Sequence, residues 1–87
     1  MKIIRSQNKA VLVRADKVSY IQVRDLTQEP GYKTSPDGDY AVAAFIDTLN
    51  TMWVMATYRT MDEALRHNDR LASFLSSSSS SGLHDMP

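Results

Sequence analysis

The chain of 87 residues contains no cysteine, so it can form neither a disulfide framework nor a thiolate metal site. Its three glycines lie far apart, which excludes a G-x-G-x-x-G phosphate loop. No apolar run approaches the roughly 20 residues needed to cross a bilayer, and the opening M-K-I-I-R is too short for a secretory signal. Because small domains without disulfides are typical of intracellular proteins, the composition predicts a soluble cytoplasmic protein without membrane association.

Signatures of catalysis and of cofactor binding are also missing. The two histidines, His67 and His84, are too few for a zinc site, which needs three or four ligands. The acidic residues Asp37, Asp39 and Asp47 lack the further ligands and the terminal glutamate of an EF-hand loop. The serines have no G-x-S-x-G context. We therefore expect no enzyme activity, no cofactor, no metal and no small-molecule substrate.

What is present indicates one small domain rich in strands. Hydrophobic residues make up 43% of the chain, which is enough for a single core. Alternation of apolar and polar residues predicts a strand at Val18–Arg24, and apolar runs predict strands at Tyr40–Asp47 and Met52–Arg59. The segments Lys2–Ser6 and Ala10–Arg14 form either a hairpin or one long strand with a bulge. A turn is expected over 48–51, and a long loop over 25–39, where Pro-Gly and Pro-Asp-Gly signals occur.

One amphipathic helix is predicted at Met61–Leu75. Thr60 and Glu63 have the spacing of a capping box, in which the threonine hydroxyl accepts from the Glu63 amide and the carboxylate returns to the Thr60 amide. Apolar residues recur after this point at helical spacing. Six serines in a row then follow, and we expect residues 76–87 to be a disordered Ser-rich tail outside the domain of residues 1–75.

These elements predict an α+β fold, in which an antiparallel meander sheet of four to five strands carries one C-terminal helix on one face. A single helix can cover only one face of such a sheet, and the alternation does not settle which face it covers. The other face would be left to solvent or to a partner, with Tyr20, Phe45 and Trp53 available there. The leading hypothesis is a non-enzymatic protein–protein interaction module, whose partner can be a second copy in a homodimer.

The alternative is a nucleic-acid-binding accessory protein. Residues 1–24 carry six cations and one anion, whereas residues 25–63 carry seven anions and two cations. This asymmetry can mark a binding face or simply reflect attraction between two parts of one fold. In the nucleic-acid reading, a basic N-terminal segment would contact the phosphate backbone through Arg5, Lys9, Arg14, Lys17 and Arg24.

Two stretches carry a resemblance to known sequences. Residues 3–7, I-I-R-S-Q, and residues 56–64, A-T-Y-R-T-M-D-E-A, resemble the opening and the strand-to-helix joint of short uncharacterised proteins from Gram-positive bacteria and their phages. This chain departs from them at Ala56, where glycine is frequent, and in the loop over 25–39 and the serine run. The resemblance implies an intracellular accessory protein related to phages or mobile elements, and it transfers no activity.

Overall fold

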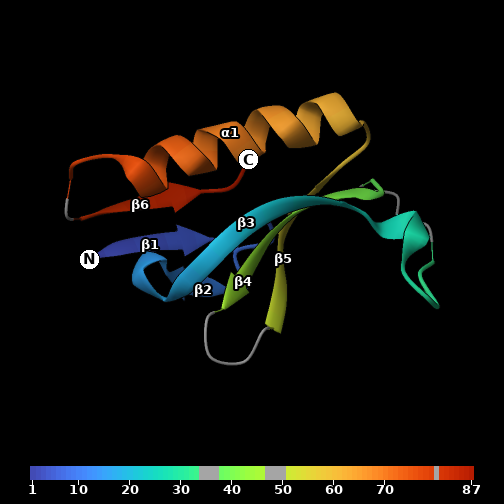
Figure 1. Ribbon diagram of the computed structural model, residues 1–87, viewed down its shortest axis with the longest axis horizontal. Coiled ribbons are helices and arrows are strands. Elements are labelled where there is room, and N and C mark those ends of the chain that lie inside the picture. Colours follow the sequence, from blue (N-terminus) through green and yellow to red (C-terminus); the bar gives the residue numbers. More distant parts are fainter. Residues whose placement is uncertain (34–37, 47–50, 80) are drawn as a thin grey trace.

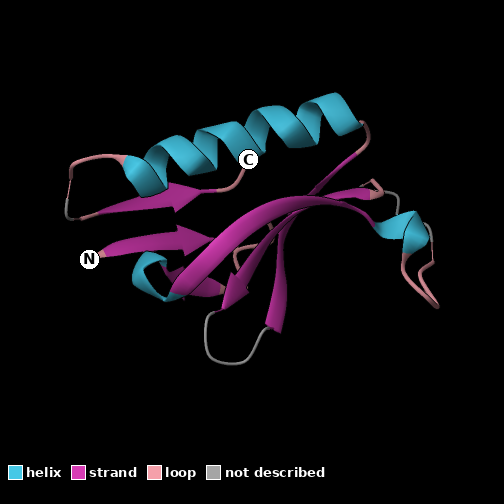
Figure 2. Cartoon of the chain, in the orientation of Figure 1, coloured by secondary structure: helices cyan, strands magenta, loops and turns pink. Residues whose placement is uncertain are grey.

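The computed structural model describes residues 1–33, 38–46, 51–79 and 81–87, and its class is α+β (Figure 1). Six strands form two three-stranded sheets in these ranges, and one helix follows β5 (Figure 2). The elements are β1 (Lys2–Arg5), β2 (Leu12–Arg14), β3 (Val18–Asp25), β4 (Tyr40–Ile46), β5 (Thr51–Tyr58), α1 (Met61–Ser76) and β6 (Gly82–Asp85). The predicted single sheet of four to five strands is therefore wrong.

The larger sheet is an antiparallel meander in the order β3-β4-β5, as predicted for these three segments. Its strands match the predicted ones to within about one residue, although Asp47 and the turn over 48–50 lie outside the described residues. One irregularity in β5 changes which of its residues share a face of the sheet. Val42 pairs with Ala56 while Ala43 pairs with Val54, so Met55 is an extra residue in β5. Such a β-bulge reverses the alternation of faces, and it places Trp53 on the same face as Ala56.

The smaller sheet has the order β2-β1-β6 and was not foreseen. β1 and β2 form an antiparallel hairpin, which settles the choice left open for the first 14 residues. The short 3-10 helix Ala15–Lys17 then turns the chain before β3, so that β2 does not continue the meander. β6 pairs with β1 in parallel, with Ile4 opposite His84. Two sheets therefore replace one because the 3-10 helix separates the N-terminal hairpin from β3, and β6 adds a third strand to that hairpin.

The prediction of a disordered tail over residues 76–87 is wrong for its last part. Gly82–Asp85 form β6, and the side chain of Met86 is only 1% exposed. The carbonyl of Pro87 accepts hydrogen bonds from the Tyr58 hydroxyl at 3.1 Å and from Gln7 Nε2 at 2.9 Å. Figure 1 shows β6 lying between α1 and β1. Residues 82–87 are thus an ordered part of the fold.

The helix begins where the sequence predicts and ends one residue later, at Ser76. The Thr60 hydroxyl accepts from the Glu63 amide at 3.1 Å, as expected of an N-cap. The same hydroxyl donates to the Glu63 carboxylate at 3.3 Å, whereas the capping box predicted that this carboxylate would accept from the Thr60 amide. At the other end the last turn has no basic residue of its own. Lys2 supplies that charge and donates to the carbonyls of Phe74 and Ser77, each at 2.8 Å.

The main core lies between α1 and both sheets. α1 packs on one face of the β3-β4-β5 sheet, where Val42, Ala44 and Ala56 are buried. The smaller sheet and the C-terminus close the same core from the side. The buried members of the cluster are Ile4, Val13, Val42, Ala44, Met55, Ala56, Tyr58, Ala64, Leu71 and Met86. This core positions one face of the larger sheet inside the molecule and leaves the opposite face outside.

Gln7 joins the two sheets at the free edge of β5. Its amide donates to the Met55 carbonyl at 2.7 Å, and its side chain accepts from the Thr57 amide at 3.1 Å. Next to it, the buried Ser6 hydroxyl accepts from the Val11 amide at 3.1 Å and closes the β1–β2 turn. Residues 3–7, which carry the resemblance, therefore have structural roles. Ile4 lies in the core, Ser6 closes the turn, and Gln7 forms hydrogen bonds with β5.

Candidate interaction surface

The face of the β3-β4-β5 sheet opposite α1 is the surface that the sequence analysis left to a partner. We call it the outer face, and the strand register defines it, because residues directly opposite each other point to the same side. Ala41, Ala43 and Phe45 of β4 are buried but do not belong to the main core. Their partners on the two flanking strands complete the outer face, whose members are Tyr20, Gln22, Arg24, Ala41, Ala43, Phe45, Met52, Val54 and Thr57.

Tyr20 and Phe45 form the aromatic centre of the outer face. Their rings stack with centroids 4.3 Å apart and planes 9° from parallel. Tyr20 covers Phe45, so that Phe45 is buried while Tyr20 itself is 49% exposed. Met52 lies opposite Phe45 on the other side, which makes an apolar row across all three strands. Val54 extends this row and is 39% exposed.

Arg24 lies at the other end of the outer face from Tyr20. Its guanidinium lies 6.0 Å from the Phe45 ring centroid and makes an ion pair with Glu29, which follows the 3-10 helix Leu26–Gln28. A guanidinium over an aromatic ring is a favourable arrangement that also holds the ring in place. The outer face therefore combines an exposed apolar end, around Tyr20 and Val54, with a polar end around Arg24.

Trp53 is not part of the outer face. The bulge at Met55 places Trp53 opposite Ala44, on the side of the sheet that carries α1. Its side chain is nevertheless 43% exposed. The structure thus brings together two of the three predicted aromatics, Tyr20 and Phe45, and separates the third. Met52 and Val54, which sequence reasoning did not select, replace Trp53 on this surface. A bulge leaves no reliable signal in the sequence, and for this reason the alternation assigned Trp53 to the wrong face of the sheet.

Four of the five cations proposed for nucleic-acid binding have carboxylate partners. Arg5 and Lys9 both contact Asp85, the latter at 3.1 Å. This contact lowers the pKa of the Asp85 carboxyl well below its usual range, because two cations donate hydrogen bonds to it. Arg14 pairs with Asp16 at 2.9 Å, and Arg24 pairs with Glu29. Glu29 is the one of these three carboxylates that belongs to the acidic segment 25–63, so most of these cations are paired within the fold but not with that segment.

A second polar cluster lies between α1 and β6, and it involves both histidines. His67 stacks on Tyr58 with centroids 4.6 Å apart, and His84 lies 5.3 Å from the Phe74 ring. Buried side-chain atoms without a hydrogen-bond partner among the described residues are His67 Nδ1, His84 Nε2 and Asn68 Oδ1. Burial lowers the pKa of both histidines, and the nearby Arg70 and Arg66 lower the pKa of His67 further.

This cluster predicts that the protein loses stability in mild acid. Both histidines have pKa values in the folded state below the ordinary value of 6.5, so the unfolded chain binds more protons below that pH. The free energy of unfolding should therefore be at its full value above about pH 6.5 and fall as the pH drops toward the folded-state pKa. Urea titrations between about pH 7 and pH 5 measure this.

The matched control for this prediction is the double variant His67→Phe/His84→Phe, which keeps two rings in the stacks and removes both titrating groups. Its stability should change little over the same pH range. The prediction fails if the natural chain is as stable at the acid end of this window as at neutral pH. It also fails if the double variant loses as much stability as the natural chain does.

No family model, curated protein or solved structure matches this chain. The resemblance noted for residues 3–7 and 56–64 accordingly stays a prediction. No helix in the described part of the chain is long and apolar enough to cross a membrane. Those same ranges hold no group of three or more potential metal ligands, while the candidate carboxylates Asp37 and Asp47 lie outside them.

Proposed function

We propose that this protein is a non-enzymatic interaction module that binds a second copy of itself through the outer face. The observation that carries the proposal is the exposed apolar end of this face, around Tyr20 and Val54, which lies on a rigid three-stranded sheet and outside the main core. Because the two ends of the face differ in polarity, a twofold arrangement can place the apolar ends of two copies against each other. The absence of cysteine supports a cytoplasmic setting for this module.

The area of the outer face determines how tightly we expect two copies to associate. Strands of seven or eight residues spaced about 4.8 Å apart give a face on the order of 300–400 Å², below the roughly 800 Å² that each partner buries in a stable complex. Self-association should therefore be reversible and weak, with a Kd from about 10 μM to about 1 mM. A weak interface of this kind suits an accessory protein that exchanges partners, which agrees with the class implied by the resemblance.

Sedimentation velocity over a range of protein concentrations tests the proposal. The natural chain should show a mass-average sedimentation coefficient that rises toward a dimer. The variant Val54→Lys places a charge in the centre of the apolar end, and it should weaken dimerisation about tenfold or more, because a desolvated lysine costs at least about 1.4 kcal/mol. Circular dichroism should show the variant folded, since Val54 is already partly exposed.

The matched control is Leu12→Lys, the same change at an exposed position of β2 in the other sheet. This variant should associate like the natural chain. A natural chain that stays monomeric at about 1 mM would refute the proposal of self-association. Equal weakening by both lysine variants would show that association does not use the outer face.

A further inference from the structure

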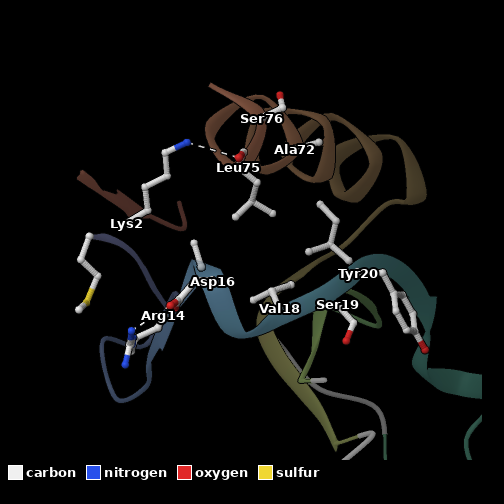
Figure 3. A pocket seen from close by; sticks show the side chains of 12 residues that line it. Lys2, Arg14, Asp16, Val18, Ser19, Tyr20, Ala72, Leu75 and Ser76 are labelled. Atoms are coloured by element: carbon white, nitrogen blue, oxygen red, sulfur yellow. Dashed lines mark hydrogen bonds and ion pairs between the residues drawn. The ribbon is translucent and has the colours of Figure 1, made fainter. Parts of the chain in front are cut away.

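A groove of about 770 Å³ lies along β3 on the side of α1, and Tyr20 belongs both to its lining and to the outer face. It is bounded by the last turns of α1, by the start of β3 and by the first residues of the chain (Figure 3). Leu75 points from α1 toward the strand that carries Val18, whereas the Tyr20 ring lies at the margin of the groove and points away from it. The volume is within the usual range for a ligand cleft.

The lining of the groove shows that it follows the edge of β3. Val18, Ser19, Tyr20 and Ile21 all contact it, and Tyr20 and Ile21, which follow the register shift at Ser19, point to opposite faces. A cavity that contacts residues from both faces must therefore run along the side of the strand. β3 is an edge strand, since it pairs with β4 alone among the strands of the described ranges. α1 contributes Ala72, Leu75 and Ser76, whose spacing of three and four residues forms one side of the helix.

We propose that this groove binds an extended peptide, which adds a strand to the free edge of β3 and places apolar side chains between β3 and α1. A strand edge offers backbone N–H and C=O groups in a row, and an added strand satisfies them. The apolar walls formed by Val18, Ile21 and Leu75 accept alternate side chains of such a strand. This surface shares Tyr20 with the outer face but lies on the α1 side of β3, so the inference does not rest on self-association.

The charges at one end of the groove select the kind of peptide. Lys2 and Arg14 both line it, and Asp16 is the single acidic residue among the lining side chains. Lys2 Nζ already donates to three carbonyls at the end of α1, so Arg14, which is held by Asp16, is the lining cation that can meet a ligand. An acidic residue at the end of the peptide nearest Arg14 complements its guanidinium. The occupant is therefore an apolar strand with an acidic end.

Titration of the ¹⁵N-labelled full chain with synthetic peptides tests the proposal. The probe is a capped eight-residue peptide of alternating valine and threonine with two aspartates at one end. Its amide shifts should map to residues 18–21 and 72–76, with saturation below about 1 mM. Replacing the two aspartates by lysines should weaken binding about twofold to fivefold, the range for an exposed ion pair. A peptide N-methylated at alternate residues cannot pair with a strand and should not bind.

Two pairs of variants locate the site. Ala72→Trp fills the groove from an exposed helix position and should abolish binding, whereas Ser73→Trp, one residue further along α1, should not. Arg14→Glu should reverse the preference between the aspartate and lysine peptides, whereas the exposed Arg66→Glu should leave it unchanged. Val54→Lys should bind the aspartate peptide like the natural chain, which separates this result from that of the outer face.

Three results would overturn the inference. The first is the absence of any shift at about 1 mM of the aspartate peptide. The second is a set of shifts that maps to the outer face at Phe45, Met52 and Val54 instead of to the groove. The third is equal binding of the N-methylated peptide, because such binding would not use the edge of β3.

Discussion

Deleting residues 82–87 is expected to unfold most of the protein at room temperature. The deletion removes β6, the buried Met86 and the carbonyl of Pro87 that accepts from Tyr58. Loss of a buried methionine side chain alone costs about 2–5 kcal/mol. A domain of this size has a total stability of about 4–13 kcal/mol, so the combined loss takes most or all of it. Far-ultraviolet circular dichroism and thermal melting of the truncated chain measure the effect.

Two single substitutions make this result specific. Met86→Ala should lower the free energy of unfolding by about 2–5 kcal/mol, because the side chain is 1% exposed and the site cannot fully collapse. Leu83→Ala should lower it by less than about 0.5 kcal/mol, because that side chain is 51% exposed. If the truncated chain melts at the same temperature as the full chain, residues 82–87 are a dispensable tail after all.

Gly38→Ala is expected to be the most damaging single substitution in the loop before β4. A methyl group at this position would lie 2.1 Å from the Tyr58 carbonyl oxygen, and this neighbour is backbone that cannot rotate away. The residue also has a φ of +122°, which side chains rarely adopt. Strain and overlap together should lower the free energy of unfolding by about 3 kcal/mol or more. Urea denaturation of the purified variant gives this number.

Gly31→Ala provides the matched control for the overlap. Gly31 also has a positive φ, of +76°, but a methyl group there would meet no atom within 4 Å. Its substitution should therefore cost only the conformational strain, about 1 kcal/mol. Equal costs at the two glycines would mean that φ alone governs both sites. A neutral Gly38→Ala variant would mean that β4 and β5 can move apart at this point.

The helix and the larger sheet follow directly from local sequence. The threonine cap at Thr60 and the helical spacing after it fix the start of α1, and the apolar runs fix β4 and β5. Local rules were less exact about what the helix buries. His67 is buried on α1, whereas the apolar Leu65 is 46% exposed. His67 is buried because its ring stacks on that of Tyr58, which belongs to β5 and lies outside the helix.

The candidate surfaces were predictable only in part. Tyr20 and Phe45 share a face because they lie directly opposite each other, just after the register shift at Ser19. Trp53 was assigned to that face although the bulge at Met55 reverses it. The groove beside β3 could not be foreseen, since it depends on where α1 lies above the sheet and on Lys2 reaching the end of that helix. Neither feature follows from neighbours in the sequence.

The sequence by itself determined the class of the fold, the positions of α1 and the β3-β4-β5 meander, and the availability of aromatic residues for a surface. Caps, alternation and helical spacing act between residues a few positions apart, so they can be recognised in the sequence. The tertiary structure decided that the C-terminal residues form β6 on the N-terminal hairpin, that the strands divide into two sheets, and that Trp53 faces away from Tyr20. Those outcomes depend on pairing between residues about 80 positions apart and on one extra residue in β5, which only the folded chain reveals.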